Sequence, residues 1–349
     1  MLAYMASFLV RDKQSRCAFA RVCRRFCGVA HDVFDQTPAF QHACRRGYVD
    51  VVKLFLTDGC VDPTALDNFA IRLGSLLGHA DIVRLLLADG RADPATNSNY
   101  AIRYSSLMGH TDIVQILLAD PRVDPTAGKN EAIRMSNQYG HTDVVQILLA
   151  DGRADPAANG NYAMRKSNEQ GHADVVRLLL GDERADPTAA NNFAIQISTE
   201  IGHTDIVRLL LADERVDPTA RDNYAIQNSS AEGHVEVVKL LLLDGRADPA
   251  ANDNGAIRWS SRSGHTDVVK LLLADGRVDP TADDNYAIRR SSENKHADVV
   301  RLLLEDGRID PTACNNYLRI GIEYGHIKVV KLLLADGRAD PTILLSAVC

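Results

Sequence analysis

Histidine and aspartate recur at fixed intervals along this chain of 349 residues, and both residue types can do chemistry. Histidine is a common zinc ligand, and aspartate can act as a general acid or base. The histidines follow Gly, or Lys in one case, in steps of 31 residues, except for a last step of 30. This column contains His79, His110, His141, His172, His203, His234, His265, His296 and His326. Ten Asp-Pro pairs, from Asp62-Pro63 to Asp340-Pro341, form a second column.

The spacing of both columns argues against catalysis. Zinc ligands lie about 2.0 to 2.1 Å from the metal, whereas equivalent atoms of stacked helices lie about 8 to 10 Å apart. We therefore expect each ring to hydrogen-bond nearby backbone. Acid-base catalysis needs two carboxyl groups in different surroundings, and these aspartates are copies of one another. The sequence has no phosphate-binding glycine loop, nucleophile elbow or metalloprotease motif. We predict no enzyme, no metal site and no cofactor.

Each repeat reads as two short helices joined at Gly-His. An Asn precedes the first helix, as at Asn68 and Asn99, and we interpret it as an N-cap that accepts hydrogen bonds from the first turn. The Gly ends that helix in a left-handed conformation. An acidic residue such as Asp81 begins the second helix, where it complements the helix dipole. In the loop that follows, Pro keeps the preceding Asp out of the helical region, and that Asp can close a side-chain turn.

The second helix is too apolar to have a single buried face. Ile82, Val83 and the three leucines at 85–87 cover a wide arc of one such helix, so it must pack between neighbours on both sides. A pair of short helices cannot bury this surface alone, and its stability has to come from stacking on adjacent pairs. The sequence therefore predicts an all-α solenoid of about ten stacked helix-turn-helix repeats.

The repeat Y-A-I-R-x-S-S-x-x-G-H-x-D-V-V-x-L-L-L-A-D-G-R-A-D resembles the ankyrin repeat over roughly residues 37 to 341. The second-helix half matches closely. In the first half, the family's Thr-Pro becomes an aromatic residue and Ala, its His becomes Arg or Gln, and its paired Ala become Ser; only Thr37-Pro38 is similar to the family's Thr-Pro. The resemblance implies a curved array with a concave surface that binds proteins. The connector is two residues shorter than in the family, which puts the projecting β-turn finger in doubt.

Two columns on the first helices are candidates for partner binding. One is basic and contains Arg72, Arg103, Arg134, Arg165, Arg258, Arg289 and Arg319. These arginines either pair with loop aspartates of the same or the next repeat, or form a groove for an acidic peptide. The other column varies, and aromatic residues dominate binding hot spots. Our candidate partner-binding residues come from three places. Tyr104, Met135, Lys166, Trp259 and Arg290 belong to the variable column, Arg103 and Arg134 belong to the basic column, and Tyr139 lies just before a Gly-His junction. Neutral variation is the alternative for the variable positions.

Composition excludes several other classes. Residues 1–48 carry eight Arg and Lys against three Asp, which leaves 31 basic and 43 acidic residues in the rest of the chain. Such an acidic array is a poor nucleic-acid binder. Seven cysteines without a Cys-x-x-Cys pair favour free thiols in a reducing compartment. The ten-residue apolar start is too short to span a membrane and weak as a signal peptide. We expect a monomer in the cytoplasm or nucleus, with no nucleic-acid or membrane partner.

The first 35 residues are predicted to form a helical segment with two possible roles. Phe19, Val22, Cys23 and Phe26 share one helical face, with arginines mostly opposite. This amphipathic helix could cap the first repeat. The run Ser7-Phe8-Leu9 with residues 20–26 also resembles the later part of an F-box, a module that docks on the adaptor subunit of cullin-type ubiquitin ligases. F-box and ankyrin arrays are combined in large DNA viruses, which would place the protein in a host cytoplasm.

The sequence therefore predicts three parts: the N-terminal helical segment at 1–35, ten repeats at 36–341 and a C-terminal cap at 342–349. We expect a protein-protein interaction scaffold that binds a partner protein on the concave face. The alternative is a substrate adaptor of a cullin-type ubiquitin ligase.

Overall fold

The computed structural model describes residues 36–59, 61–309 and 314–337. Within these ranges the chain is helical and contains no strand. The assignments made above to residues 1–35 and 342–349 lie outside them. The helices are α3 (Thr37–Arg46), α4 (Val49–Thr57), α5 (Ala65–Leu77), α6 (Ala80–Asp89), α7 (Thr96–Leu107), α8 (Thr111–Leu118), α9 (Ala127–Gln138), α10 (Thr142–Asp151), α11 (Ala158–Gln170), α12 (Ala173–Leu180), α13 (Ala189–Ile201), α14 (Thr204–Leu211), α15 (Ala220–Ala231), α16 (Val235–Asp244), α17 (Ala251–Ser263), α18 (Thr266–Asp275), α19 (Ala282–Glu293), α20 (Ala297–Asp306), α21 (Cys314–Glu323) and α22 (Ile327–Ala335).

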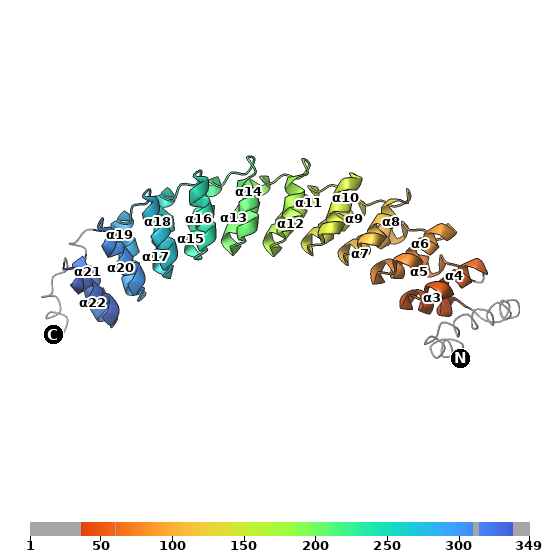
Figure 1. The fold of residues 1–349 in the computed structure, drawn as a ribbon, viewed down its shortest axis with the longest axis horizontal. Helices are drawn as coiled ribbons and strands as arrows, with labels where there is room; N and C mark the ends of the chain where they lie inside the picture. The colour runs from red at the N-terminus through yellow and green to blue at the C-terminus, as the bar shows by residue number, and fades with distance from the viewer. Residues whose placement is uncertain (1–35, 60, 310–313, 338–349) are drawn as a thin grey trace. The chain divides into compact units, whose positions relative to one another are not determined.

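The helices belong to two compact units. The N-terminal unit comprises Met1–Gln170 and Gly181–Ala185, and the C-terminal unit comprises Gly171–Leu180 and Asp186–Cys349. Within each unit the helices follow one another in chain order (Figure 1). First helices pack on first helices, such as α7 on α5 and α9, and second helices pack on second helices, such as α18 on α16 and α20. This is the predicted stacked arrangement of helix pairs, and the all-α solenoid class is confirmed.

Burial of the second helices follows the expected pattern. In α6, Ile82, Val83 and Leu86 are fully buried and Leu87 is half-buried. The helix packs on α4 and α8 within the N-terminal unit, so its wide apolar arc is covered from both sides as predicted. None of the described helices is long and apolar enough to cross a membrane.

The Gly-His junction combines a left-handed cap with an inter-repeat hydrogen bond. Gly78 has φ 81° at the end of α5, as predicted for a helix C-cap. The ring of His110 from the next repeat packs on it, so that a Cβ at Gly78 would lie 2.9 Å from His110 Cε1. The Nε2 of His110 lies 3.1 Å from the carbonyl oxygen of Leu76 and donates to it. The junction therefore requires Gly for both backbone conformation and space.

The interpretation of the recurrent Asn as an N-cap is wrong. Asn99 follows Asn97 and Ser98 in a run of three left-handed residues, with φ between 51° and 58°. Its side chain does not cap the helix; Oδ1 accepts a hydrogen bond of 2.8 Å from the backbone N–H of Asp124, in the loop between α8 and α9. The same bond recurs at Asn68, Asn130, Asn192, Asn223 and Asn254. A short amide side chain tolerates the left-handed region, which explains the choice of residue.

The connecting loops contain no strand in the described part of the chain. Their Asp-Pro aspartates close side-chain turns as expected: Asp124 Oδ1 accepts from the Thr126 backbone N–H at 2.8 Å and from its hydroxyl at 2.7 Å. A shortened connector is thus ordered by side-chain hydrogen bonds and by the left-handed turn instead of by a hairpin.

Candidate partner-binding surface

The arginine column of the first helices serves mainly to hold the left-handed turn. Arg72 Nε donates to the carbonyl oxygen of Asp67 at 2.8 Å, and its Nη2 donates to that of Leu66 at 3.0 Å. Gln196 reaches the carbonyl oxygen of Asn191 in the same way. The sequence analysis predicted that these arginines either pair with loop aspartates or form a free basic groove. Neither alternative included the backbone carbonyl groups of the left-handed turns as partners.

Some members of this column also form ion pairs. Arg103 pairs with Glu131 of the next repeat at 2.8 Å and has a side chain only 17% exposed. Arg258 pairs with Asp253 of its own turn at 3.0 Å and with Asp283 of the next repeat at 3.6 Å. Charges that are already paired and partly buried are less available to an acidic ligand than free ones.

In the N-terminal unit, an aromatic stack brings Tyr104 next to this column. Its ring stacks on that of Tyr100, with centroids 3.9 Å apart and planes 14° apart. The Arg72 guanidinium lies 5.4 Å from the Tyr100 centroid, and that of Arg103 lies 5.8 Å from the Tyr104 centroid. Burial, followed by the neighbouring Tyr104, raises the pKa of Tyr100 above its usual value. Tyr104 and Arg103 are therefore held rigidly side by side.

The other predicted residues of this unit are placed separately along α9 and α11. Arg134 lies 5.1 Å from the Tyr162 ring centroid and donates to the Gly128 carbonyl oxygen. Met135 is half-buried. Lys166 forms an ion pair with Glu169, one turn further along α11.

The position just before the junction glycine is strongly exposed and apolar in three successive repeats of this unit. Leu77 is 43% exposed, Met108 is 49% exposed and Tyr139 is 54% exposed. These side chains do not contribute to the buried core, and they extend the candidate surface beyond the one tyrosine selected from the sequence.

The C-terminal unit contains the most concentrated set of candidate residues. Trp259, which is half-buried, packs edge-to-face on Tyr286 with ring centroids 5.8 Å apart. The guanidinium groups of Arg258 and Arg262 lie 5.8 and 5.6 Å from the Trp259 centroid. That of Arg290 lies 5.3 Å from the Tyr286 centroid. The structure thus brings Trp259 and Arg290 together through Tyr286, which the sequence analysis did not select.

Arg290 is fixed by one further contact. It forms an ion pair of 2.7 Å with Glu293, and this hydrogen bond raises the pKa of the Arg290 guanidinium. An amphipathic ring surrounded by guanidinium groups suits protein recognition, because it offers apolar area, hydrogen-bond donors and little conformational freedom to lose.

The histidine column has the predicted structural role. Six rings donate from Nε2 to a carbonyl oxygen 34 residues earlier, at 2.9 to 3.1 Å: His79, His110, His141, His234, His265 and His296. In the described residues no group of three His, Cys, Asp or Glu side chains could hold a metal ion. The buried thiol of Cys44 is also unsuited to reaction, since burial raises its pKa to about 12.

A salt bridge that recurs in the connecting loops was missed by the sequence analysis. We call it the Asp-x-Arg clasp. In the clasp of Asp151 and Arg153, Nε and Nη2 each lie 2.8 Å from one carboxylate oxygen. Arg153 also donates to the carbonyl oxygens of Val123 at 2.9 Å and Leu118 at 3.0 Å, both in the preceding repeat. The arginine therefore ties one loop to the one before it.

The clasp recurs in eight loops of the described chain. Its pairs are Asp89–Arg91, Asp120–Arg122, Asp151–Arg153, Asp182–Arg184, Asp213–Arg215, Asp244–Arg246, Asp275–Arg277 and Asp306–Arg308. Hydrogen bonding to Arg153 lowers the pKa of Asp151 below its ordinary value. Because every guanidinium is engaged in the scaffold, these loops offer no free basic site.

Comparison with known families agrees with this architecture. A family model described as "Ankyrin repeats (3 copies)" matches residues 100–191, 162–253, 194–284 and 257–344. A model described as "Ankyrin repeat" matches residues 35–68. A comparison with curated proteins finds no match.

Proposed function

Because the chain belongs to the ankyrin repeat family, whose arrays are protein-protein interaction scaffolds, we propose that it binds a partner protein through the aromatic residues of its first helices. The observation that carries this proposal is the packing of Trp259 on Tyr286 amid four arginines. Trp259, Arg262 and Arg290 of this cluster lie at repeat positions that differ from one repeat to the next, whereas the residues that build the clasps and junctions recur.

The physical basis is the arrangement of a binding hot spot. Trp, Tyr and Arg are the residues whose truncation most weakens protein interfaces, and all three meet here. Neighbouring rings and guanidinium groups hold Trp259 in place before a partner arrives, which lowers the entropy lost on binding. In the N-terminal unit the Tyr100–Tyr104 stack offers a smaller surface of the same kind.

The test uses Trp259→Ala in the full chain, with Ile197→Ala as the matched control. Ile197 occupies the same position of its repeat and is also half-buried. Proteins captured from a eukaryotic lysate by the unchanged chain are identified, and the affinity of the purified partner is then measured for each variant. We expect Trp259→Ala to weaken binding about tenfold or more and Ile197→Ala to change it less than about twofold.

Equal affinities for both variants would count against the proposal. If a melting curve shows that Trp259→Ala has unfolded the array, Trp259→Phe, which keeps an aromatic ring, replaces it in the same comparison. The chain has a single Trp, so its fluorescence gives an independent readout, and a partner bound on this cluster has to shift the emission.

The ubiquitin-ligase adaptor function is a second proposal and rests only on the sequence of residues 1–35. Its test is capture by the full chain against a chain that begins at residue 36. Cullin-ligase subunits retained by the full chain alone would support it. Their absence from both would leave the interaction scaffold without that role.

A further inference from the structure

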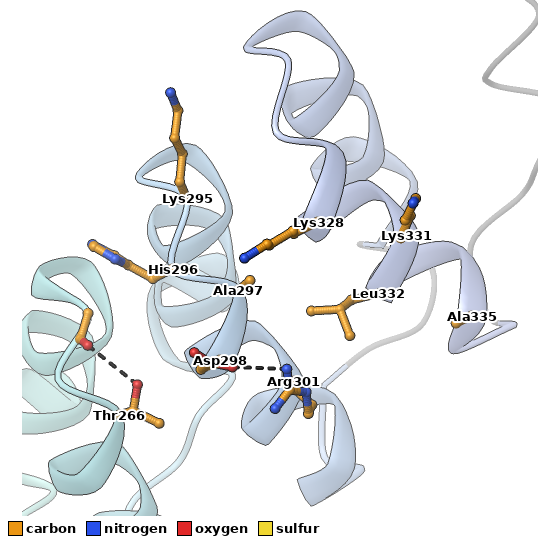
Figure 2. Close-up of a pocket in the computed structure, with 11 residues that line it drawn as sticks. Thr266, Lys295, His296, Ala297, Asp298, Arg301, Lys328, Lys331, Leu332 and Ala335 are labelled. Carbon is orange, nitrogen blue, oxygen red and sulfur yellow. Dashed lines mark hydrogen bonds and ion pairs between the residues drawn. The ribbon is translucent and has the colours of Figure 1, made fainter.

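A basic cleft lies between the second helices α20 and α22 of the C-terminal unit (Figure 2). Its volume is about 630 Å³. Lys295, Arg301, Lys328 and Lys331 contribute four cationic side chains, against the single carboxylate of Asp298. Figure 2 shows Lys328 reaching from α22 toward α20, with Leu332 on the wall between the two helices. The cleft therefore combines an apolar wall with a net positive charge.

The equivalent surfaces of other repeats lack this charge. Between α18 and α20, the same five positions hold Gly264, Asp267, Lys270, Asp298 and Arg301, whose formal charges cancel. At the cleft they hold Lys295, Asp298, Arg301, Lys328 and Lys331, with a formal charge of +3. Two exchanges account for this difference in formal charge: Lys replaces Gly at 295, and Lys replaces an acidic residue at 328.

Neither exchange helps the fold. Lys295 has φ 68°, a left-handed conformation that a residue with a side chain adopts at a cost. Lys328 lies in the first turn of α22, where the helix dipole disfavours a positive charge and the regular repeats place Asp or Glu. Two residues that the fold disfavours thus line one cleft, which indicates a role outside the scaffold.

The lysines of the cleft are available to a ligand. Lys295, Lys328 and Lys331 are exposed, and in the part of the chain that the structure describes none of them forms an ion pair. Only Arg301 is engaged, through its 2.9 Å contact with Asp298. Arg84, Arg177 and Arg208 are likewise paired with the first-turn aspartates of their own helices.

We propose that this cleft binds an acidic segment of the partner protein, with carboxylates on Lys295, Lys328 and Lys331 and an apolar side chain against Leu332. The inference rests on the proposed scaffold function and adds a second contact surface to it. Separate lysine ammonium groups suit several dispersed carboxylates, whereas a phosphate group is matched by the fork of a free arginine. The one arginine present is already paired.

The experiment measures fluorescence anisotropy of a labelled peptide in which glutamates flank one leucine, with the full chain. We expect Lys328→Glu combined with Lys331→Glu to weaken binding by about tenfold or more, since each reversal turns attraction into repulsion. The matched control is Lys53→Glu combined with Lys239→Glu. These exposed lysines occupy the same helix position as Lys331 in other repeats, and the control makes the same change in net charge.

Three results would overturn the proposal: no binding of the peptide at physiological salt, equal weakening by both double variants, or unchanged binding when glutamine replaces the glutamates. Tighter binding of the same peptide with phosphoserine in place of glutamate would assign the cleft to phosphate instead. Failure of the cleft proposal is distinguishable from failure of the scaffold function. If only the cleft proposal fails, the captured partner still shifts the Trp259 fluorescence of the Lys328→Glu, Lys331→Glu variant.

Discussion

Two junctions of the C-terminal unit use the same motif with different residues. At the regular one, Gly264 ends α17, and His296 Nε2 donates to the carbonyl oxygen of Arg262 at 3.0 Å. At the other, Lys295 stands in place of Gly, and His326 uses Nδ1 to reach the carbonyl oxygen of Ser292 at 2.7 Å. His326 is also buried, at 6% exposure.

The difference shows what the recurrent glycine does. A Cβ at Gly264 would lie 2.4 Å from His296 Nδ1, so a ring in that position excludes any side chain. Lys295 keeps the left-handed backbone, with φ 68°, although it carries a Cβ. His326 bonds through its other nitrogen and to the carbonyl oxygen three residues before Lys295, whereas His296 bonds to the one two residues before Gly264. The lysine junction therefore differs from the regular one in both the ring nitrogen and the accepting carbonyl group.

The largest effect we expect comes from acid and acts on the Asp-x-Arg clasps, which occur in the loops that follow both the Gly264 and the Lys295 repeat. Hydrogen bonds from the clasp arginines lower the pKa values of Asp89, Asp120, Asp151, Asp182, Asp213 and Asp275 below 3.8. A carboxyl group with a lowered folded-state pKa stabilises the fold fully above its unfolded value of 3.8 and loses that contribution as the pH falls through the folded value. The midpoint of thermal unfolding should fall steeply below about pH 4.

Thermal unfolding followed by circular dichroism between pH 7 and pH 3 measures this dependence. Repeating it in 0.5 M NaCl is the control, because salt screens general charge repulsion more than close hydrogen-bonded pairs. A midpoint that is constant down to pH 3, or that falls only at low salt, would show that the clasps do not stabilise the array.

The next effect separates the two requirements for Gly at the regular junction. Gly264→Ala should destabilise the protein by about 3 kcal/mol, because the added Cβ meets both the left-handed penalty and the His296 ring. Gly276→Ala should cost only about 1 kcal/mol. Gly276 has φ 80° against 84° for Gly264, and no described atom lies within 4 Å of its Cβ position.

Urea unfolding at neutral pH gives both free energies. Equal losses for the two variants would mean that the ring moves away at no cost. The contrast between the regular and the lysine junction would then have another origin.

The contrast also shows which features a sequence reveals. The period, the wide apolar arc of α6 and the left-handed glycines are local patterns, and they predicted the repeat fold. The pattern that placed Asn99 before a helix could not show that its neighbours are left-handed or that its amide accepts a hydrogen bond from Asp124, in the loop after α8. The partners of Arg153 in the preceding repeat are backbone carbonyl groups, which carry no residue-specific signal.

The candidate site was predictable to a similar degree. Trp259 and Arg290 stood out because their column varies, but Tyr286 did not, because an aromatic residue recurs at its position. Lys328 carried a signal that was overlooked: one basic residue in a column of acids. Departures within a recurrent column are therefore as informative as a column that varies throughout.

The smallest effect in this series is a gain in stability. Lys295→Gly should raise the free energy of unfolding by about 1 kcal/mol, because glycine adopts the left-handed cap without strain. Lys295→Ala is the matched control, since it removes the same charge but keeps the Cβ and should leave stability nearly unchanged. With Gly at 295, the space above the junction opens, and NMR of the His326 ring should show the proton move from Nδ1 to Nε2. A lower unfolding midpoint for Lys295→Gly would show that this junction has another shape. If Lys295→Gly instead stabilises the chain and weakens binding of the acidic peptide, Lys295 lowers stability in favour of binding, as functional residues often do.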